Sequence, residues 1–136
     1  MGTQGKTILK FVLKGWAANS FSRTEGIAFI AFTPNDARNQ ISAFKDKTSR
    51  VLVCPSLDWS WSDIANAVDG VVTDHGTRVS RGSEVSGIVQ VPAVLGTNNA
   101  TSKIQDGDFI EIICSGNEAV AKVFAKSSRS KYFDSL

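Results

Sequence analysis

The stretch from Gly70 to Thr97, GVVTDHGTRVSRGSEVSGIVQVPAVLGT, decides the fold of this chain. A short apolar run ends in Thr73-Asp74, and a loop containing Gly76 leads into a segment of small residues. A second apolar run spans Val89 to Leu95. This pattern predicts a strand, a loop that enters a helix N-terminus, and a return strand, an arrangement in which α/β proteins often keep functional groups.

Size and composition predict one compact domain over residues 1–136. The chain has 42% hydrophobic and 21% charged residues, which are ordinary values for a globular protein that can bury a core. A net charge of +2 with scattered basic residues argues against nucleic acid and against an anionic membrane surface as partners. No apolar stretch approaches the roughly 20 residues of a membrane span.

The cysteines and the single histidine limit the metal and redox chemistry. Cys54 and Cys114 each lie in a β-like run and form no C-x-x-C motif, so we expect buried, reduced thiols and a cytoplasmic protein. With His75 as the one histidine, a zinc site built from histidine and cysteine is not expected. The sequence predicts neither a metal nor a cofactor.

The N-terminal third is predicted to contain two strands. Thr7 to Leu13 mixes β-branched and apolar residues, and Ile27 to Phe32 is a continuous apolar run typical of a strand covered on both faces. Between them, Gly15 to Gly26 is rich in small polar residues and is predicted as a loop. Trp16 and Phe21 in that loop are expected to pack inward.

A helix should follow at once. Thr33 is placed as the N-cap and Pro34 as the first helical residue. The spacing of Ala37, Ile41 and Phe44 then predicts one buried stripe along the helix.

A buried strand and a second, short helix are predicted before the central stretch. The strand is Val51 to Cys54, the helix is capped by Ser62, and Gly70 closes it as a left-handed C-terminal residue. The inner face of this helix is predicted to consist of Ile64, Ala65 and Val68.

The C-terminal part is predicted to be strand-rich. Asp106-Gly107 is a strong turn signal, and Phe109 to Cys114 and Ala119 to Phe124 are predicted to pair as a hairpin. The polar segment 126–136 is predicted to fray. Strands thus outnumber short helices, which predicts a compact α/β or β/β/α layered domain.

Two segments carry a family resemblance. VLVCPSLDWSWSDIANAVDGVVTDHG and, further on, VPAVLGTNNATSKIQDGDFIEI resemble the mobile, swivelling phosphohistidine domain of phosphoenolpyruvate (PEP)-utilising enzymes, such as pyruvate phosphate dikinase, PEP synthase and enzyme I of the sugar phosphotransferase system. The resemblance covers residues 14–123 and implies a swivelling β/β/α domain. The matching motif residues are Thr73, Asp74, Gly76, Pro92 and Gly96.

The family's signature, G-G-x-T-[SC]-H-[AS]-A, aligns with residues 76–83. Gly76 and Ser80 are retained, but the position of the phosphorylated histidine is Arg81. An imidazole offers a nucleophilic nitrogen near neutral pH, whereas a guanidinium stays protonated and has no free lone pair. Arg81 therefore cannot carry a phosphoryl group.

His75 and Arg81 each leave two interpretations open. His75, six residues before the expected position, is either a solvent-exposed loop residue or a displaced phosphoacceptor. Arg81 in the first turn after a Ser80 cap could join Arg78 and the free amides of the helix N-terminus in holding an anion. Alternatively, Glu84 pairs with one of the two arginines and leaves an ordinary charged surface.

Two acidic positions are expected to be structural. Asp58 and Trp59 match the family's P-D-W loop and are expected to pack the domain. Asp74 is expected to cap or brace the loop before Gly76.

The resemblance and its missing histidine suggest two functions. The first is a degenerate, stand-alone swivelling domain that acts as an interaction or regulatory module. The alternative is a component of a PEP- or ATP-dependent phosphoryl-transfer system with a separate nucleotide- or PEP-binding partner. Because no G-x-x-x-x-G-K-[ST] loop is present, the chain is not expected to be a complete enzyme by itself.

Overall fold

The computed structural model describes residues 8–77 and 79–125. Within these ranges the chain forms seven strands, four α-helices and one 3₁₀ helix. In chain order they are β1 (Leu9–Ala17), β2 (Ser22–Ile30), α1 (Pro34–Ala43), β3 (Arg50–Cys54), η2 (Trp59–Trp61), α2 (Ser62–Ala67), β4 (Gly70–Thr73), α3 (Arg81–Val89), β5 (Ala93–Leu95), α4 (Ala100–Lys103), β6 (Phe109–Ser115) and β7 (Glu118–Phe124).

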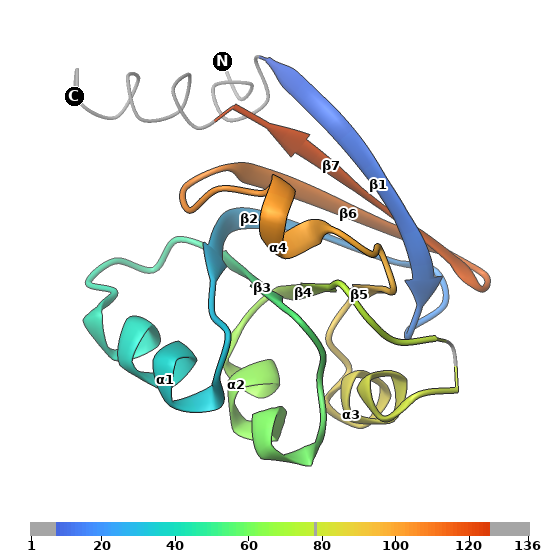
Figure 1. The fold of residues 1–136 in the computed structure, drawn as a ribbon, viewed down its shortest axis with the longest axis horizontal. Helices are drawn as coiled ribbons and strands as arrows, with labels where there is room; N and C mark the ends of the chain where they lie inside the picture. The colour runs from blue at the N-terminus through green and yellow to red at the C-terminus, as the bar shows by residue number, and fades with distance from the viewer. Residues whose placement is uncertain (1–7, 78, 126–136) are drawn as a thin grey trace.

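The strands form a closed ladder in the order β1-β5-β4-β3-β2-β6-β7, which the pairing of β1 with β7 completes. Strands β2 to β5 run parallel, and β6, β7 and β1 are antiparallel to their neighbours. Figure 1 shows α1, α2 and α3 together on one side of β2–β5, with β6, β7 and β1 arching over the other side. The predicted single α/β domain with two β layers and a helical layer is confirmed.

Successive side chains of the central strands face two different hydrophobic cores. In β3, Val51 and Val53 face the core between the β layers, whereas Leu52 and Cys54 face the core under the helices. Successive side chains of a strand point to opposite faces, so a strand covered on both sides must be apolar throughout. All four residues are fully buried.

The predicted loop between the first two strands is wrong. β1 continues to Ala17 and β2 starts at Ser22, so most of that segment is β-structure. The inward packing predicted for two aromatic residues is also wrong, because Trp16 is 43% exposed and Phe21 is 81% exposed. The reason is register: Gly15 faces inward, where a Cβ would lie 2.3 Å from the carbonyl oxygen of Leu95, and this turns Trp16 outward.

Helix boundaries were predicted with mixed success. The Thr33 hydroxyl accepts a hydrogen bond from the Asp36 amide (3.1 Å), which confirms the cap of α1. Ser62, by contrast, is the first residue of α2 and not its cap. Gly70 starts β4 without a left-handed φ, and a Cβ there would lie 2.8 Å from Cγ2 of Thr24. Close packing, not a left-handed turn, requires this glycine.

The C-terminal hairpin and the state of the thiols are confirmed. β6 and β7 pair antiparallel, and Cys54 and Cys114 are both free and buried. Burial raises the pKa of the Cys54 thiol far above its ordinary value, and the nearby charge of Asp74 raises it further. The predicted fraying segment 126–136 lies outside the described residues. Over the described ranges, no helix is long and apolar enough to cross a bilayer.

Candidate functional site at the signature loop

The signature loop, residues 74–80, connects β4 to α3, and β5 returns beside β4. This is the strand–loop–helix–strand arrangement predicted from the sequence. The loop lies at the carboxyl ends of parallel strands, where open α/β sheets commonly bind ligands. Its base (Thr73 and Asp74, with Gly76 and Gly96) and its tip (Thr77, Val79 and Arg81) differ in burial and in hydrogen bonding.

Thr73 joins the carboxyl ends of two strands. Its hydroxyl donates to the carbonyl of His75 (2.6 Å) and accepts from the amide of Gly96 (3.4 Å). The amide and hydroxyl of Thr97 both donate to the Thr73 carbonyl, at 3.0 and 2.9 Å. Because Thr73 is fully buried, these bonds hold the start of the loop to the end of β5.

Asp74 braces the loop, as predicted, but it does so through a distant segment. Its carboxylate accepts hydrogen bonds from the amide (2.8 Å) and hydroxyl (2.5 Å) of Thr101 in α4. Its carbonyl accepts from the amide of Asn98 (2.8 Å). A buried carboxylate that accepts two hydrogen bonds holds its partner segment firmly, so the role of Asp74 here is structural.

Two motif glycines contact each other through their backbones. Gly76 has φ +123° and Gly96 has φ +75°, values that side-chain-bearing residues rarely adopt. A Cβ on Gly96 would lie 2.3 Å from the carbonyl oxygen of Gly76. The same position would be 3.5 Å from Cδ1 of Trp16, so this aromatic ring borders the loop.

Pro92 and Ser80 set the ends of the connection through α3. Ser80 caps the helix as predicted: its hydroxyl accepts from the Ser83 amide (3.4 Å) and donates to the Thr77 carbonyl (2.8 Å). After the helix, the Pro92 carbonyl accepts from the Val71 amide (3.0 Å) and so directs β5 alongside β4.

Arg81, the residue that the sequence resemblance aligns with the phosphoacceptor, is the first residue of α3 and is exposed. In the described part of the chain, it forms no ion pair with Glu84 or any other carboxylate. Its charge instead acts on Asp58 in the neighbouring loop. Arg78, the other proposed anion ligand, lies outside the described residues.

Asp58 is stabilised in its charged form. Hydrogen bonds from the side chain and backbone of Ser60 lower the pKa of Asp58, and the positive charge of Arg81 lowers it further. Asp58 thereby caps η2, with the Ser60 amide donating at 2.8 Å. Trp59 beside it is 44% exposed and Asp58 is exposed as well, so Asp58 has a structural role as the cap of η2, whereas the expected packing of this pair against the domain is not observed.

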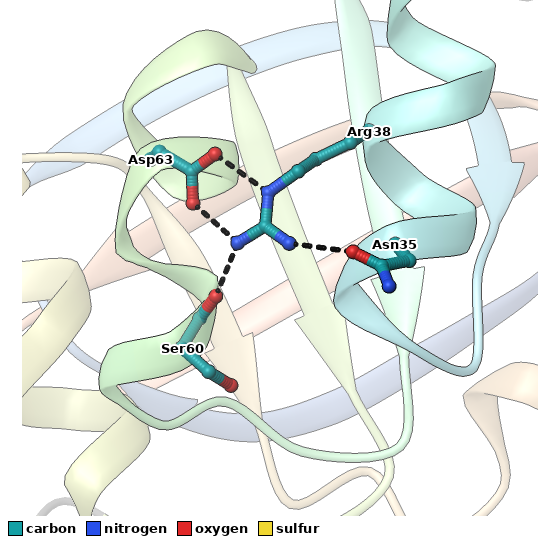
Figure 2. A network of polar contacts seen from close by, with 4 residues as sticks. All are labelled: Asn35, Arg38, Ser60 and Asp63. Carbon is teal, nitrogen blue, oxygen red and sulfur yellow. Dashed lines mark hydrogen bonds and ion pairs between the residues drawn. The ribbon is translucent and has the colours of Figure 1, made fainter.

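Arg38 of α1 holds the segment around Ser60 and Asp63 against that helix (Figure 2). The sequence analysis did not identify Arg38. Its guanidinium donates to both oxygens of Asp63 (2.9 and 3.0 Å), to the Ser60 carbonyl (2.9 Å) and to Asn35 (3.0 Å). A planar fork that matches a carboxylate in this way holds its partner in one orientation. No local pattern identifies such a bridge, because Arg38 and Asp63 are 25 residues apart.

His75 is exposed, while its backbone is fixed. Its amide donates to the Pro55 carbonyl (2.9 Å) and its carbonyl accepts from Thr73. Exposure agrees with the interpretation of His75 as a solvent-facing loop residue, and it also leaves the ring accessible to a phosphoryl donor.

Comparison with known proteins identifies the family. A profile described as "PEP-utilising enzyme, mobile domain" matches residues 46–116, which contain the signature loop. The chain belongs to this mobile-domain family. The sequence resemblance is thereby confirmed, and the loop from Thr73 to Arg81 lies within the matched residues.

Relatives are much longer proteins. The chain is 35% identical over 68 residues to phosphoenolpyruvate synthase of Aquifex aeolicus, covering 50% of this chain and 8% of the relative. It is 33% identical over 95 residues to a probable phosphoenolpyruvate synthase of Staphylothermus marinus, covering 70% and 11%. An NMR structure of Enzyme I aligns with 25% identity over 69% of this chain and 39% of that chain, with a TM-score of 0.47.

Proposed function

We propose that this domain is a degenerate phosphohistidine-type module that docks on a phosphoryl-transfer partner without carrying the phosphoryl group. The observation that supports this proposal is an exposed arginine, Arg81, at the start of α3, where the sequence resemblance places the phosphoacceptor. The hydrogen bonds around Thr73 and Asp74 preserve the frame of the loop. A retained frame with a non-nucleophilic residue supports binding or regulation over catalysis.

The partner we propose is a separate chain or domain that binds a nucleotide or PEP. The relatives named phosphoenolpyruvate synthase are about ten times longer than the matched region, so the family's mobile domain works beside other domains there. Arg81 suits such a partner because a guanidinium binds phosphate oxygens in a bidentate manner. The free, buried thiols of Cys54 and Cys114 support the cytoplasmic location that we propose.

Restoring the histidine tests the loss of the carrier role. Full-length Aquifex aeolicus phosphoenolpyruvate synthase, inactivated at its own phosphoacceptor, would be incubated with labelled PEP and either wild type or Arg81→His. We expect acid-labile phosphohistidine on Arg81→His and none on wild type, because the altered chain regains a nucleophilic nitrogen.

The same assay tests the alternative. If the chain is instead a component of phosphoryl transfer that uses His75 as a displaced acceptor, the wild-type chain would be labelled. His75→Ala would then abolish the label. Wild-type labelling of this kind would overturn the degenerate-module proposal.

Docking is tested by affinity. Arg81→Ala should weaken binding to the PEP-loaded synthase about tenfold, the effect of losing one charge-assisted contact. Glu84→Ala, one turn along the same helix, is the matched control and should leave the dissociation constant unchanged. Equal affinity of wild type and Arg81→Ala would remove the main support for the proposal.

A further inference from the structure

The outer face of the β1–β7 pair carries a groove that the signature loop does not explain. The groove has a volume of about 590 Å³ and is lined by Lys14, Gly15, Trp16, Glu118, Ala119 and Val120. Volumes of this order are typical of small-molecule sites.

Register places two apolar and two charged side chains alternately around this groove. Trp16 lies opposite Glu118, and Lys14 lies opposite Val120. Each apolar side chain is therefore diagonal to the other, and each charge is diagonal to the opposite charge. The groove thus has an aromatic wall with a cation at one corner and an anion at the other.

The two charges do not neutralise each other. In the part of the chain that the structure describes, neither Lys14 nor Glu118 forms an ion pair, and both side chains are exposed. A surface lysine and glutamate at diagonal positions ordinarily gain little by pairing, so both remain available to a ligand. The half-exposed indole of Trp16 offers a stacking face between them.

We propose that this groove binds a small aromatic α-amino acid. Its ring stacks on Trp16 and contacts Val120, its carboxylate pairs with Lys14, and its ammonium pairs with Glu118. Only a ligand that combines a ring with charges of both signs satisfies every group that lines the groove. The proposal is independent of the docking function, because it uses neither Arg81 nor the loop base.

The test is an NMR titration of the ¹⁵N-labelled chain with three probes. L-phenylalanine carries all three groups, 3-phenylpropanoate lacks the amine, and 2-phenylethylamine lacks the carboxylate. We expect saturable shifts of the amides of residues 14–16 and 118–120, with phenylalanine binding about tenfold more tightly than either analogue, the effect of one charge-assisted contact.

Single substitutions in the groove test which residue binds each group of the ligand. Trp16→Ala should weaken phenylalanine binding at least tenfold, and Trp59→Ala, which removes a tryptophan of similar exposure elsewhere, should not change it. Glu118→Gln should abolish the preference over 3-phenylpropanoate, and Lys14→Met the preference over 2-phenylethylamine. Equal binding of all three probes, no saturable shift at millimolar concentration, or equal loss in Trp59→Ala would each overturn the proposal.

Discussion

The base and the tip of the signature loop differ in burial. At the base, Thr73 and Asp74 are buried and hydrogen-bonded. At the tip, Val79 is 86% exposed, and Arg81 faces solvent without an ion pair in the described chain. The base consists of Thr73, Asp74, Gly76 and Gly96, and the tip of Thr77, Val79 and Arg81. The base is tied to β5 and α4 by hydrogen bonds of buried polar groups, which supports a role in folding. Because the tip is exposed, we expect its residues to contribute little to folding. On the proposed function, this separation allows the domain to keep the frame of the loop with Arg81 at the expected phosphoacceptor position.

The largest effect should come from the glycine contact in the base. Gly96→Ala should lower the free energy of unfolding by about 3 kcal/mol or more, because its Cβ would meet the Gly76 carbonyl at a positive φ. Urea denaturation followed by circular dichroism measures this. Gly87→Ala is the control: no atom lies within 4 Å of its Cβ, so a gain of about 0.5–1 kcal/mol is expected. Equal effects at both glycines would contradict the role assigned to the close contact between Gly96 and Gly76.

A hydroxyl deletion compares base and tip directly. Thr73→Val should cost about 1–3 kcal/mol, since it leaves the Gly96 amide and His75 carbonyl without their buried partner. Thr77→Val removes an exposed hydroxyl that accepts from the Val79 amide (3.3 Å), and water can replace it. We expect a change of under about 0.5 kcal/mol there. The reverse order, measured by the same denaturation, would show that the tip contributes to stability.

Two substitutions near Asp58 should raise the pKa of its carboxyl group by different amounts. Ser60→Ala should raise the pKa of Asp58 more than Arg81→Ala does, because it removes the hydrogen bond of the Ser60 hydroxyl, which is the largest cause of the lowered pKa. Carbon-detected NMR titration of the Asp58 carboxyl measures both, and Ser42→Ala on the exposed face of α1 should change neither. Added salt should weaken only the Arg81 contribution. A larger shift in Arg81→Ala would identify a direct ion pair.

The sign of the resulting stability effect follows from the direction of that shift. A carboxylate with a lowered pKa in the folded state stabilises the fold above its unfolded pKa, and this contribution is lost as the pH falls through the folded value. Because Asp58 is exposed, solvent screens the contribution, and it should be small in both variants.

The smallest effect should be that of Arg81 on stability. Arg81→Ala removes a cation that opposes the dipole of α3 and also removes its attraction to Asp58, so the two changes oppose each other. The free energy of unfolding should change by less than about 0.5 kcal/mol. Thermal and urea unfolding check this, and a loss above about 1 kcal/mol would assign Arg81 a structural role instead.

Elements with a strong local pattern were predicted well from the sequence. The Thr33-Pro34 helix start, the Ser80 cap and the hairpin after Asp106-Gly107 depend on residues within a few positions of each other. Their hydrogen bonds and dihedral preferences are set locally. The family motif was equally visible, because its glycines and threonine stand at fixed spacing.

Predictions failed where packing between distant segments decides the outcome. Gly15 and Gly70 resemble turn residues in the sequence, but each is required where a strand approaches another segment too closely for a Cβ. The outward position of Trp16 follows from the first of these contacts. The Arg38–Asp63 bridge likewise joins α1 to α2 across 25 residues and has no signature in either segment.

The sequence alone determined the strand–loop–helix–strand unit and the family, because periodicity, caps and motif spacing are local properties. The absence of a phosphoacceptor at Arg81 remains a prediction from the sequence. Only the tertiary structure decided that β1 and β7 close the barrel, that Asp74 tethers α4, that Asp58 lies within the field of Arg81, and that Trp16 lines an outer groove. These features depend on register and long-range pairing, which local pattern does not specify.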